Sequence, residues 1–164
     1  MIKPFIRPVV LVLAAGAFSL LLLNRVQAGG SHYFPPVADP LVQSECGSCH
    51  LAFAPSMLPA RSWQALMGGL QNHFGDDATV DPATAEKITR YLIENAADRA
   101  GQRQGSKLQR GLSAASTPLR ITELPKWISE HREVSARNWR DPKVRSRANC
   151  TACHADAAQG YYED

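Results

Sequence analysis

The sequence predicts an all-α fold that is irregular and rich in loops, and three observations support this prediction. Apolar side chains recur at helical spacing in several short segments, whereas the alternation that is typical of strands is almost absent. The aspartate–proline pairs at positions 81–82 and 141–142 are typical of helix starts. The 11 prolines and 11 glycines interrupt the chain often. We therefore expect short helices with long connections.

Residues 1–28 have the features of an export signal. Lys3 and Arg7 precede an almost unbroken apolar run over residues 9–23, and Val26 and Ala28 place small residues at the cleavage positions. We expect cleavage after Ala28 and a periplasmic protein. An uncleaved membrane anchor is the alternative, but the run is shorter than the about 20 apolar residues that a bilayer requires.

The net charge of +3 does not indicate nucleic-acid binding. Three of the 18 basic side chains lie in the expected signal, which holds no acidic residue, so the mature chain has 15 basic and 15 acidic side chains. A formal net charge of zero provides no general attraction for a polyanion such as nucleic acid.

Residues 29–99 are expected to form the first of two small lobes. An extended, proline-rich lead-in opens this lobe. The residue pattern then predicts a short helix, a loop and two further helical segments, over Val42–His50, Ala54–Pro59, Arg61–His73 and Asp81–Ala97 respectively.

Residues 100–118 are expected to be a flexible polar linker, because this stretch is rich in Gly, Gln, Ser, Lys and Arg and has almost no large apolar residues. The second lobe covers residues 119–164. It is predicted to contain a short helix over Leu124–Val134, opened by Pro125, and a last helix from Asp141 to about Gly160.

Two copies of the motif C-x-x-C-H account for every cysteine in the chain. The motif is the attachment site of c-type haem: the two thiols add to the haem vinyl groups, and the adjacent histidine becomes an axial iron ligand. We therefore expect two covalently bound haem c groups. A Cys₄ zinc site is disfavoured, because a histidine directly follows each cysteine pair in an exported chain. The motif residues are Cys46, Cys49 and His50, and Cys150, Cys153 and His154.

The second axial ligand of each iron determines what the haem can do. A histidine gives a closed site of low potential, a methionine raises the potential, and an open position permits ligand binding or catalysis. His73 lies 23 positions after His50, and His131 lies 23 positions before His154, each on an apolar helical face. We expect His73 and His131 to be the distal ligands, so that all four histidines bind iron.

Three other residues are weaker candidates for the distal position. His32 lies in the proline-rich lead-in and is expected at the surface or at a haem edge. Met57 lies in a proline-flanked loop, whereas Met67 belongs to an apolar stripe and is expected to pack in the core. No methionine follows Met67, so the C-terminal lobe has none to offer the second haem.

At these motifs the chain resembles the exported dihaem cytochrome c family, bacterial proteins with bis-histidine haems that transfer electrons beside membrane b-type cytochromes. The resemblance implies two helical lobes, and it carries the distal ligand role onto His73 and His131. It also implies redox partners, namely a membrane b-type cytochrome and, in some relatives, a small oxygen-binding monohaem cytochrome. The matching segments are Glu45–His50, Leu58–Trp63, Leu70–Gly75 and Asn149–His154.

These observations favour a periplasmic electron carrier between a membrane b-type cytochrome and a soluble redox partner. We expect no catalytic residue, no small-molecule substrate and no nucleic-acid partner. One alternative is a dihaem peroxidase or reductase, or a ligand-sensing haem protein, in which one axial ligand is displaceable. Another is a subunit of a respiratory complex that is anchored by its N-terminus.

Overall fold

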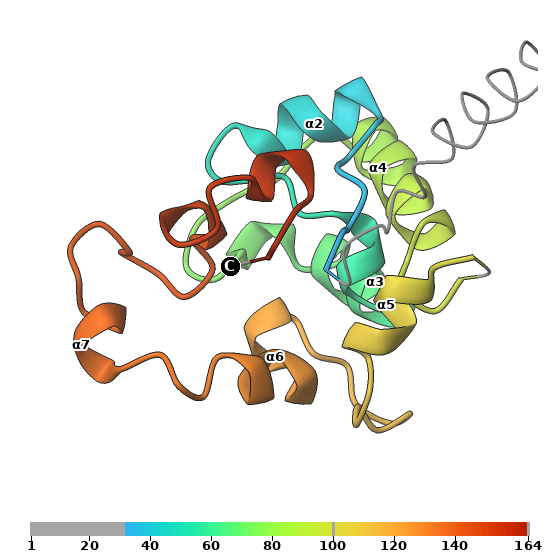
Figure 1. Cartoon of the computed structure of the whole chain (residues 1–164). Helices are drawn as coiled ribbons and strands as arrows, with labels where there is room; N and C mark the ends of the chain where they lie inside the picture. Colours follow the sequence, from blue (N-terminus) through green and yellow to red (C-terminus); the bar gives the residue numbers. More distant parts are fainter. Residues whose placement is uncertain (1–31, 100, 164) are drawn as a thin grey trace, which may run out of the picture.

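The computed structural model describes residues 32–99 and 101–163, which form short helices joined by loops (Figure 1). Within these residues the strand-like features are two isolated bridges, Tyr33 with Tyr161 and His73 with Asp76. The predicted all-α, irregular and loop-rich fold is therefore confirmed. The α-helices are α2 (Pro40–Gly47), α3 (Ala60–Met67), α4 (Pro82–Glu94), α5 (Arg103–Leu108), α6 (Pro125–Glu130) and α7 (Ala136–Trp139). The 3₁₀ turns are η1 (Pro55–Met57), η2 (Leu70–Asn72), η3 (Ile121–Glu123), η4 (Cys150–Ala152) and η5 (Ala157–Gln159).

An aspartate followed by a proline begins both α2 and α4. The Asp39 carboxylate accepts hydrogen bonds from two backbone N–H groups of the first turn of α2, at 2.9 and 3.1 Å. The Asp81 carboxylate does the same in α4, with both distances 3.1 Å. Proline fits the first helical position because its missing N–H would have had no partner there. These caps explain why the two helices begin at Pro40 and Pro82.

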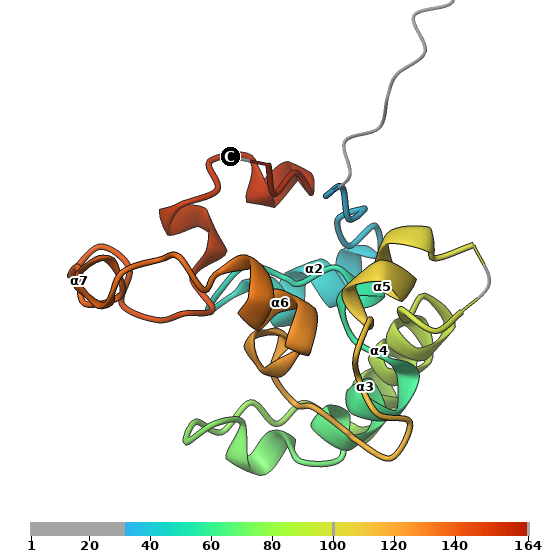
Figure 2. The same cartoon turned by 60° about the horizontal axis from the view of Figure 1, so that its bottom comes forward.

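The packing of α3 against α4 contributes one part of the hydrophobic core. Trp63 of α3 and Ile88 and Leu92 of α4 are buried in it, together with Leu58 from the preceding loop. The Trp63 indole N–H donates to the carbonyl of Pro55 at 2.8 Å, so burial leaves this polar group satisfied. In both views α3, α4 and α5 lie together at one side of the molecule and α7 lies at the other, with α6 between them (Figure 1 and Figure 2).

The segment predicted as a flexible linker, 100–118, contains the helix α5, and this corrects the expectation of a mobile connection. Leu108 is buried in the core, and α5 packs against η1 and α6. Gly105 lies close to η1 and to the residues that follow α4. A Cβ atom at this position would meet the Ser56 carbonyl oxygen at 2.5 Å and Ala97 Cα at 2.8 Å. Leu108, the partly buried Leu112 and a close backbone approach at Gly105 hold this largely polar stretch against the core.

The prediction of one long helix from Asp141 to about Gly160 is wrong. The Asp141 carboxylate accepts from the Lys143 N–H at 2.8 Å in a turn, and Arg145 has a left-handed backbone with φ of 58°. The second haem motif therefore lies on η4 and not on an α-helix. The predicted helix over 61–73 also ends early, at Met67, because two glycines follow it.

The beginning and the end of the described chain lie side by side. The Phe34 N–H donates to the Gly160 carbonyl at 2.8 Å, and the Tyr162 N–H donates to the His32 carbonyl at 3.2 Å. Phe34, Val42 and Trp127 belong to one hydrophobic cluster, so residues from both predicted lobes share a core. The lobe boundaries at 29–99 and 119–164 stay a prediction.

The expected signal peptide, residues 1–28, lies outside the described residues. Among residues 32–99 and 101–163, none of the helices has the length and apolar character needed to span a bilayer.

Candidate haem-binding sites

The first C-x-x-C-H motif begins at the end of α2. Cys46 is in the last turn of this helix, whereas Cys49 and His50 follow it. Burial, assisted by the negative charge of Glu45, raises the pKa of the Cys46 thiol. Nδ1 of the His50 ring lies 2.7 Å from the Leu51 carbonyl oxygen, which can only accept a hydrogen bond. The proton is therefore on Nδ1, and Nε2 keeps the lone pair that binds a metal.

His73 faces the first motif. Its ring centre is 6.2 Å from that of His50, and the two ring planes are 20° apart. A tight turn holds His73 in place: its N–H donates to the Asp76 carbonyl at 2.7 Å, and Phe74 adopts a left-handed backbone with φ of 60°. Burial, with smaller contributions from His50 and Arg120, lowers the pKa of His73. A lowered pKa favours the neutral imidazole, which is the form that binds iron.

The second motif lies on η4 and the residues directly after it. Cys150 begins η4, and burial raises the pKa of its thiol to about 11. His131, at the end of α6, faces His154 with ring centres 6.1 Å apart and ring planes 78° apart. Nδ1 of His131 donates to the Trp127 carbonyl at 2.9 Å, so Nε2 of His131 also keeps its lone pair.

Both histidine pairs have the spacing that a shared iron requires. A metal–imidazole bond is about 2 Å long and the ring centre lies roughly 1 Å behind the bonded nitrogen, so two imidazoles on opposite sides of one metal have centres roughly 6 Å apart. The pairs at 6.2 and 6.1 Å therefore fit an iron between the rings. The residues present fit two haem groups, one for each pair.

The weaker candidates for the distal position have other surroundings. His32 lies 3.9 Å from the carboxylate of Glu130, the last residue of α6. Met57 is buried in the hydrophobic core, and Met67 packs against that core from α3. Ordinary packing accounts for the two methionines, and His32 lies beside a carboxylate.

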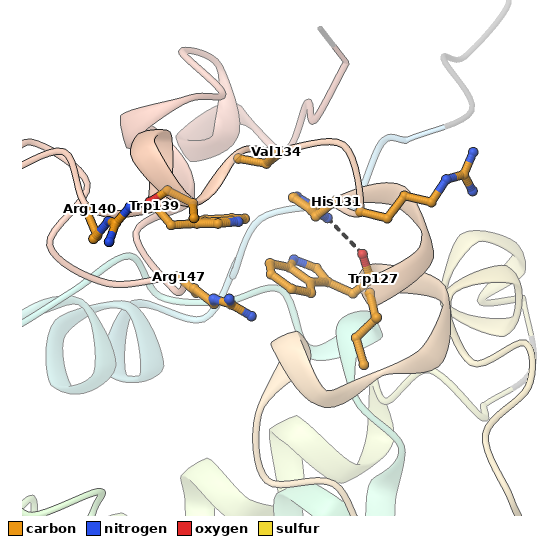
Figure 3. Close-up of a pocket in the computed structure, with 9 residues that line it drawn as sticks. Trp127, His131, Val134, Trp139, Arg140 and Arg147 are labelled. Atoms are coloured by element: carbon orange, nitrogen blue, oxygen red, sulfur yellow. Dashed lines mark hydrogen bonds between the residues drawn. The ribbon is translucent and has the colours of Figure 1, made fainter.

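His131 and His73, the expected distal ligands, each line a cavity. The one beside His131 has a volume of about 470 Å³, and Trp127 and Trp139 form much of its wall (Figure 3). Arg132, Arg140 and Arg147 also line it. The other cavity, of about 290 Å³, lies beside His73 and Phe74. No sequence motif groups these three arginines, which are spread over 16 residues, and only the fold brings them to one cavity.

The match to known proteins is consistent with this geometry. The family described as dihaem cytochrome c matches residues 42–162. The chain belongs to the dihaem cytochrome c family. The dihaem cytochrome is thus a haem protein of the electron-transfer type, with two covalently bound haem c groups. Its resemblance to this family, inferred above from the motif segments, is confirmed.

Solved structures of dihaem cytochromes c are similar to this dihaem cytochrome. A diheme cytochrome c from Rhodobacter sphaeroides is 50% identical, with a TM-score of 0.70, over 77% of this chain and 98% of that one. The diheme cytochrome c of Shewanella baltica OS155 is 34% identical, with a TM-score of 0.61, over 76% of this chain and 86% of that one. No curated protein matches the chain.

Proposed function

We propose that this dihaem cytochrome is a periplasmic electron carrier that accepts electrons from a membrane b-type cytochrome and passes them to a soluble redox partner such as a small monohaem cytochrome. The observation that carries the proposal is the presence of two facing histidine pairs at 6.2 and 6.1 Å. We assign His50 and His73 to the N-terminal haem, and His131 and His154 to the C-terminal haem.

Two nitrogen ligands on each iron leave no position for a substrate. The bound haem groups supply one-electron chemistry. The chain's own residues would attach each group through two thiols and would present two imidazoles to it. Electron transfer through the haem edge needs no displacement of a ligand, so a closed site suits a carrier better than an enzyme.

The cavity beside His131 favours one alternative, a haem protein that binds a small ligand after His131 leaves the iron. Two contacts oppose that movement, because His131 is hydrogen-bonded to the Trp127 carbonyl and stacks on the Trp127 indole. An axial ligand that is both hydrogen-bonded and stacked is displaced less readily from the iron. This supports a role as an electron carrier.

The choice of partners rests on the resemblance to bacterial members of the family, and the periplasmic location rests on the expected signal peptide. A mature chain with balanced charges is consistent with a freely diffusing protein that meets both a membrane partner and a soluble one.

Substitution of His73 by alanine tests the proposal. We expect one of the two ferric haems of His73→Ala to become high-spin, the reduced variant to bind carbon monoxide, and the potential of that haem to rise, because a donor to ferric iron is lost. Absorption spectra and a redox titration of the holoprotein measure these changes.

The matched control is His32→Ala, which removes the remaining histidine and should leave both haems low-spin. High-spin bands or fast carbon monoxide binding in the unsubstituted protein would overturn the carrier and favour a ligand-binding or catalytic role. An unchanged spectrum of His73→Ala would show that His73 does not bind iron.

A further inference from the structure

The two histidine pairs are nearly equal in separation but differ in the angle between their rings. The ring planes of His50 and His73 are 20° apart, so this pair is close to parallel. The ring planes of His131 and His154 are 78° apart, so this pair is close to crossed. Equal separation with unequal angles indicates two irons with the same ligand types and different electronic surroundings.

The ring angle matters because each bound imidazole donates π electrons along the normal to its plane. Parallel rings donate into the same iron d orbital and raise its energy above that of its partner orbital. Crossed rings donate into both orbitals and leave them close in energy. Ferric low-spin iron has one unpaired electron in this pair of orbitals, so the angle between the imidazole rings changes its electron paramagnetic resonance spectrum. Through the axial ligands the same angle also affects the reduction potential of the haem.

Trp127 contacts His131 in two ways. Its indole ring stacks on the imidazole with ring centres 4.0 Å apart and planes 15° apart. Its backbone carbonyl accepts the Nδ1 proton of the same imidazole at 2.9 Å (Figure 3). Stacking keeps the plane of the imidazole nearly parallel to that of the indole. The hydrogen bond limits rotation of the imidazole about the normal to its own plane. One residue, four positions earlier in the chain, therefore defines the plane of the His131 ring.

Trp127 is itself held firmly. It is buried, lies on α6, and meets Trp139 with ring centres 5.9 Å apart. His73 has a different kind of neighbour: the Phe74 ring is inclined at 60° to it, and a backbone turn positions it. The two distal histidines are thus oriented by different interactions: an aromatic stack orients His131, and a tight backbone turn orients His73.

We propose that Trp127 is a positioning residue that holds the His131 ring across the His154 ring and so makes the C-terminal haem electronically distinct from the N-terminal haem. This inference rests on the proposed function, because it uses His73 and His131 as the distal ligands. The N-terminal haem then has near-parallel imidazoles, and the C-terminal haem has near-crossed ones.

Low-temperature electron paramagnetic resonance of the oxidised holoprotein tests the inference directly. A ferric haem with near-parallel imidazoles gives three resolved g values, whereas one with near-crossed imidazoles gives a single large g value and a broad remainder. We expect both signals, in equal amounts. Two low-spin signals of the same class would overturn the inference while leaving the carrier intact. A high-spin signal would instead contradict the ligand assignment and hence the proposed function.

A motif variant assigns each signal to a haem. The double substitution Cys150→Ala with Cys153→Ala removes covalent attachment of the C-terminal haem. We expect it to lose the large-g signal and to keep the signal with three resolved values. The opposite loss would overturn the inference.

Substitution of Trp127 tests its positioning role. Trp127→Leu removes the stacked ring but keeps the backbone carbonyl, so the large-g signal should shift or broaden toward the three-value class while the other signal is unchanged. Trp127→Phe restores an aromatic ring and should largely restore the large-g signal. An unchanged large-g signal in Trp127→Leu would show that Trp127 does not position His131.

The matched control is Trp63→Leu. Trp63 and Trp127 are both 8% exposed, but Trp63 lies on α3, and its indole donates to Pro55. We expect Trp63→Leu to leave both signals in place, and equal effects of the two substitutions would overturn the inference. Trp127→Leu could fail to accumulate with two haems. The unsubstituted protein and Trp127→Phe then still test the proposal, because absence of the large-g signal from either one contradicts it.

Discussion

At the residue scale, a backbone carbonyl orients one histidine of each pair. Nδ1 of His50 donates to the adjacent Leu51 carbonyl, and Nδ1 of His131 donates to the Trp127 carbonyl. These bonds do not depend on any particular side chain, so they select the tautomer that leaves Nε2 for iron regardless of neighbouring substitutions. A nearby backbone carbonyl therefore fixes the tautomer of His50 and of His131, whereas the angle between the two rings of a pair depends on the fold.

Gly105 is a residue whose importance its sequence context does not show. It lies in a polar segment, yet a Cβ there would meet two backbone atoms, the Ser56 carbonyl oxygen at 2.5 Å and Ala97 Cα at 2.8 Å. Backbone atoms cannot rotate away as a flexible side chain can. We expect Gly105→Ala to lower the free energy of unfolding by about 1–3 kcal/mol, the usual cost of overpacking.

Thermal or urea unfolding of the oxidised holoprotein measures this loss. Gly68→Ala is the control, because a Cβ at Gly68 has its nearest neighbour at 3.4 Å and the backbone has a negative φ of −76°. That substitution should change stability far less. Equal stability of the two variants would show that α5 does not pack closely against η1.

At the element scale, the same start signal led to a helix in one place and not in another. Asp81 with Pro82 begins α4, whereas the pair at 141–142 begins only a turn. The difference lies in the residues after each proline. α4 presents Ile88 and Leu92 to the core at helical spacing, but after position 142 the chain offers Val144 among basic and small residues. A cap lowers the cost of starting a helix, and burial of an apolar stripe provides most of its stability.

For α5 the prediction failed in the other direction, because a segment of polar composition forms a packed helix. One large apolar side chain of this helix is buried in the core. Leu108 is buried, whereas the neighbouring Lys107 is exposed. We expect Leu108→Ala to lower the free energy of unfolding by about 2–5 kcal/mol through loss of burial and a residual cavity. Lys107→Ala should change it by less than about 0.5 kcal/mol.

Chemical unfolding of the two variants side by side distinguishes a packed helix from a flexible linker. If residues 100–118 were a mobile connection, both substitutions would be nearly neutral, and the structure of this segment would be contradicted.

At the scale of the whole molecule, the two haem motifs are 104 positions apart in sequence but belong to one packed unit. The lead-in at Phe34 pairs with the chain end at Gly160, and Phe34 and Trp127 contribute to the same core. The fold joins the N-terminal and C-terminal segments around one core.

Mass spectrometry of the exported protein tests the assembly as a whole. We expect a chain that begins near Gly29 and carries the mass of two haem groups. The double variant Cys150→Ala with Cys153→Ala should retain the mass of one. The equivalent variant at Cys46 and Cys49 is the matched control and should retain the other.

A mass equal to the bare polypeptide in the unsubstituted protein would contradict covalent attachment. A chain that begins at Met1 would contradict cleavage of the signal and favour an N-terminal anchor.

The sequence by itself determined the cofactor chemistry, because attachment of c-type haem needs only five consecutive residues and each motif is complete within them. It also predicted the all-α class and the start of α4 at Pro82, since caps and apolar spacing are local features. The tertiary structure decided which elements pack, how the segment 101–118 is ordered, and at what angle the histidine rings meet. These properties depend on contacts between residues that are distant along the chain, and no local pattern encodes them.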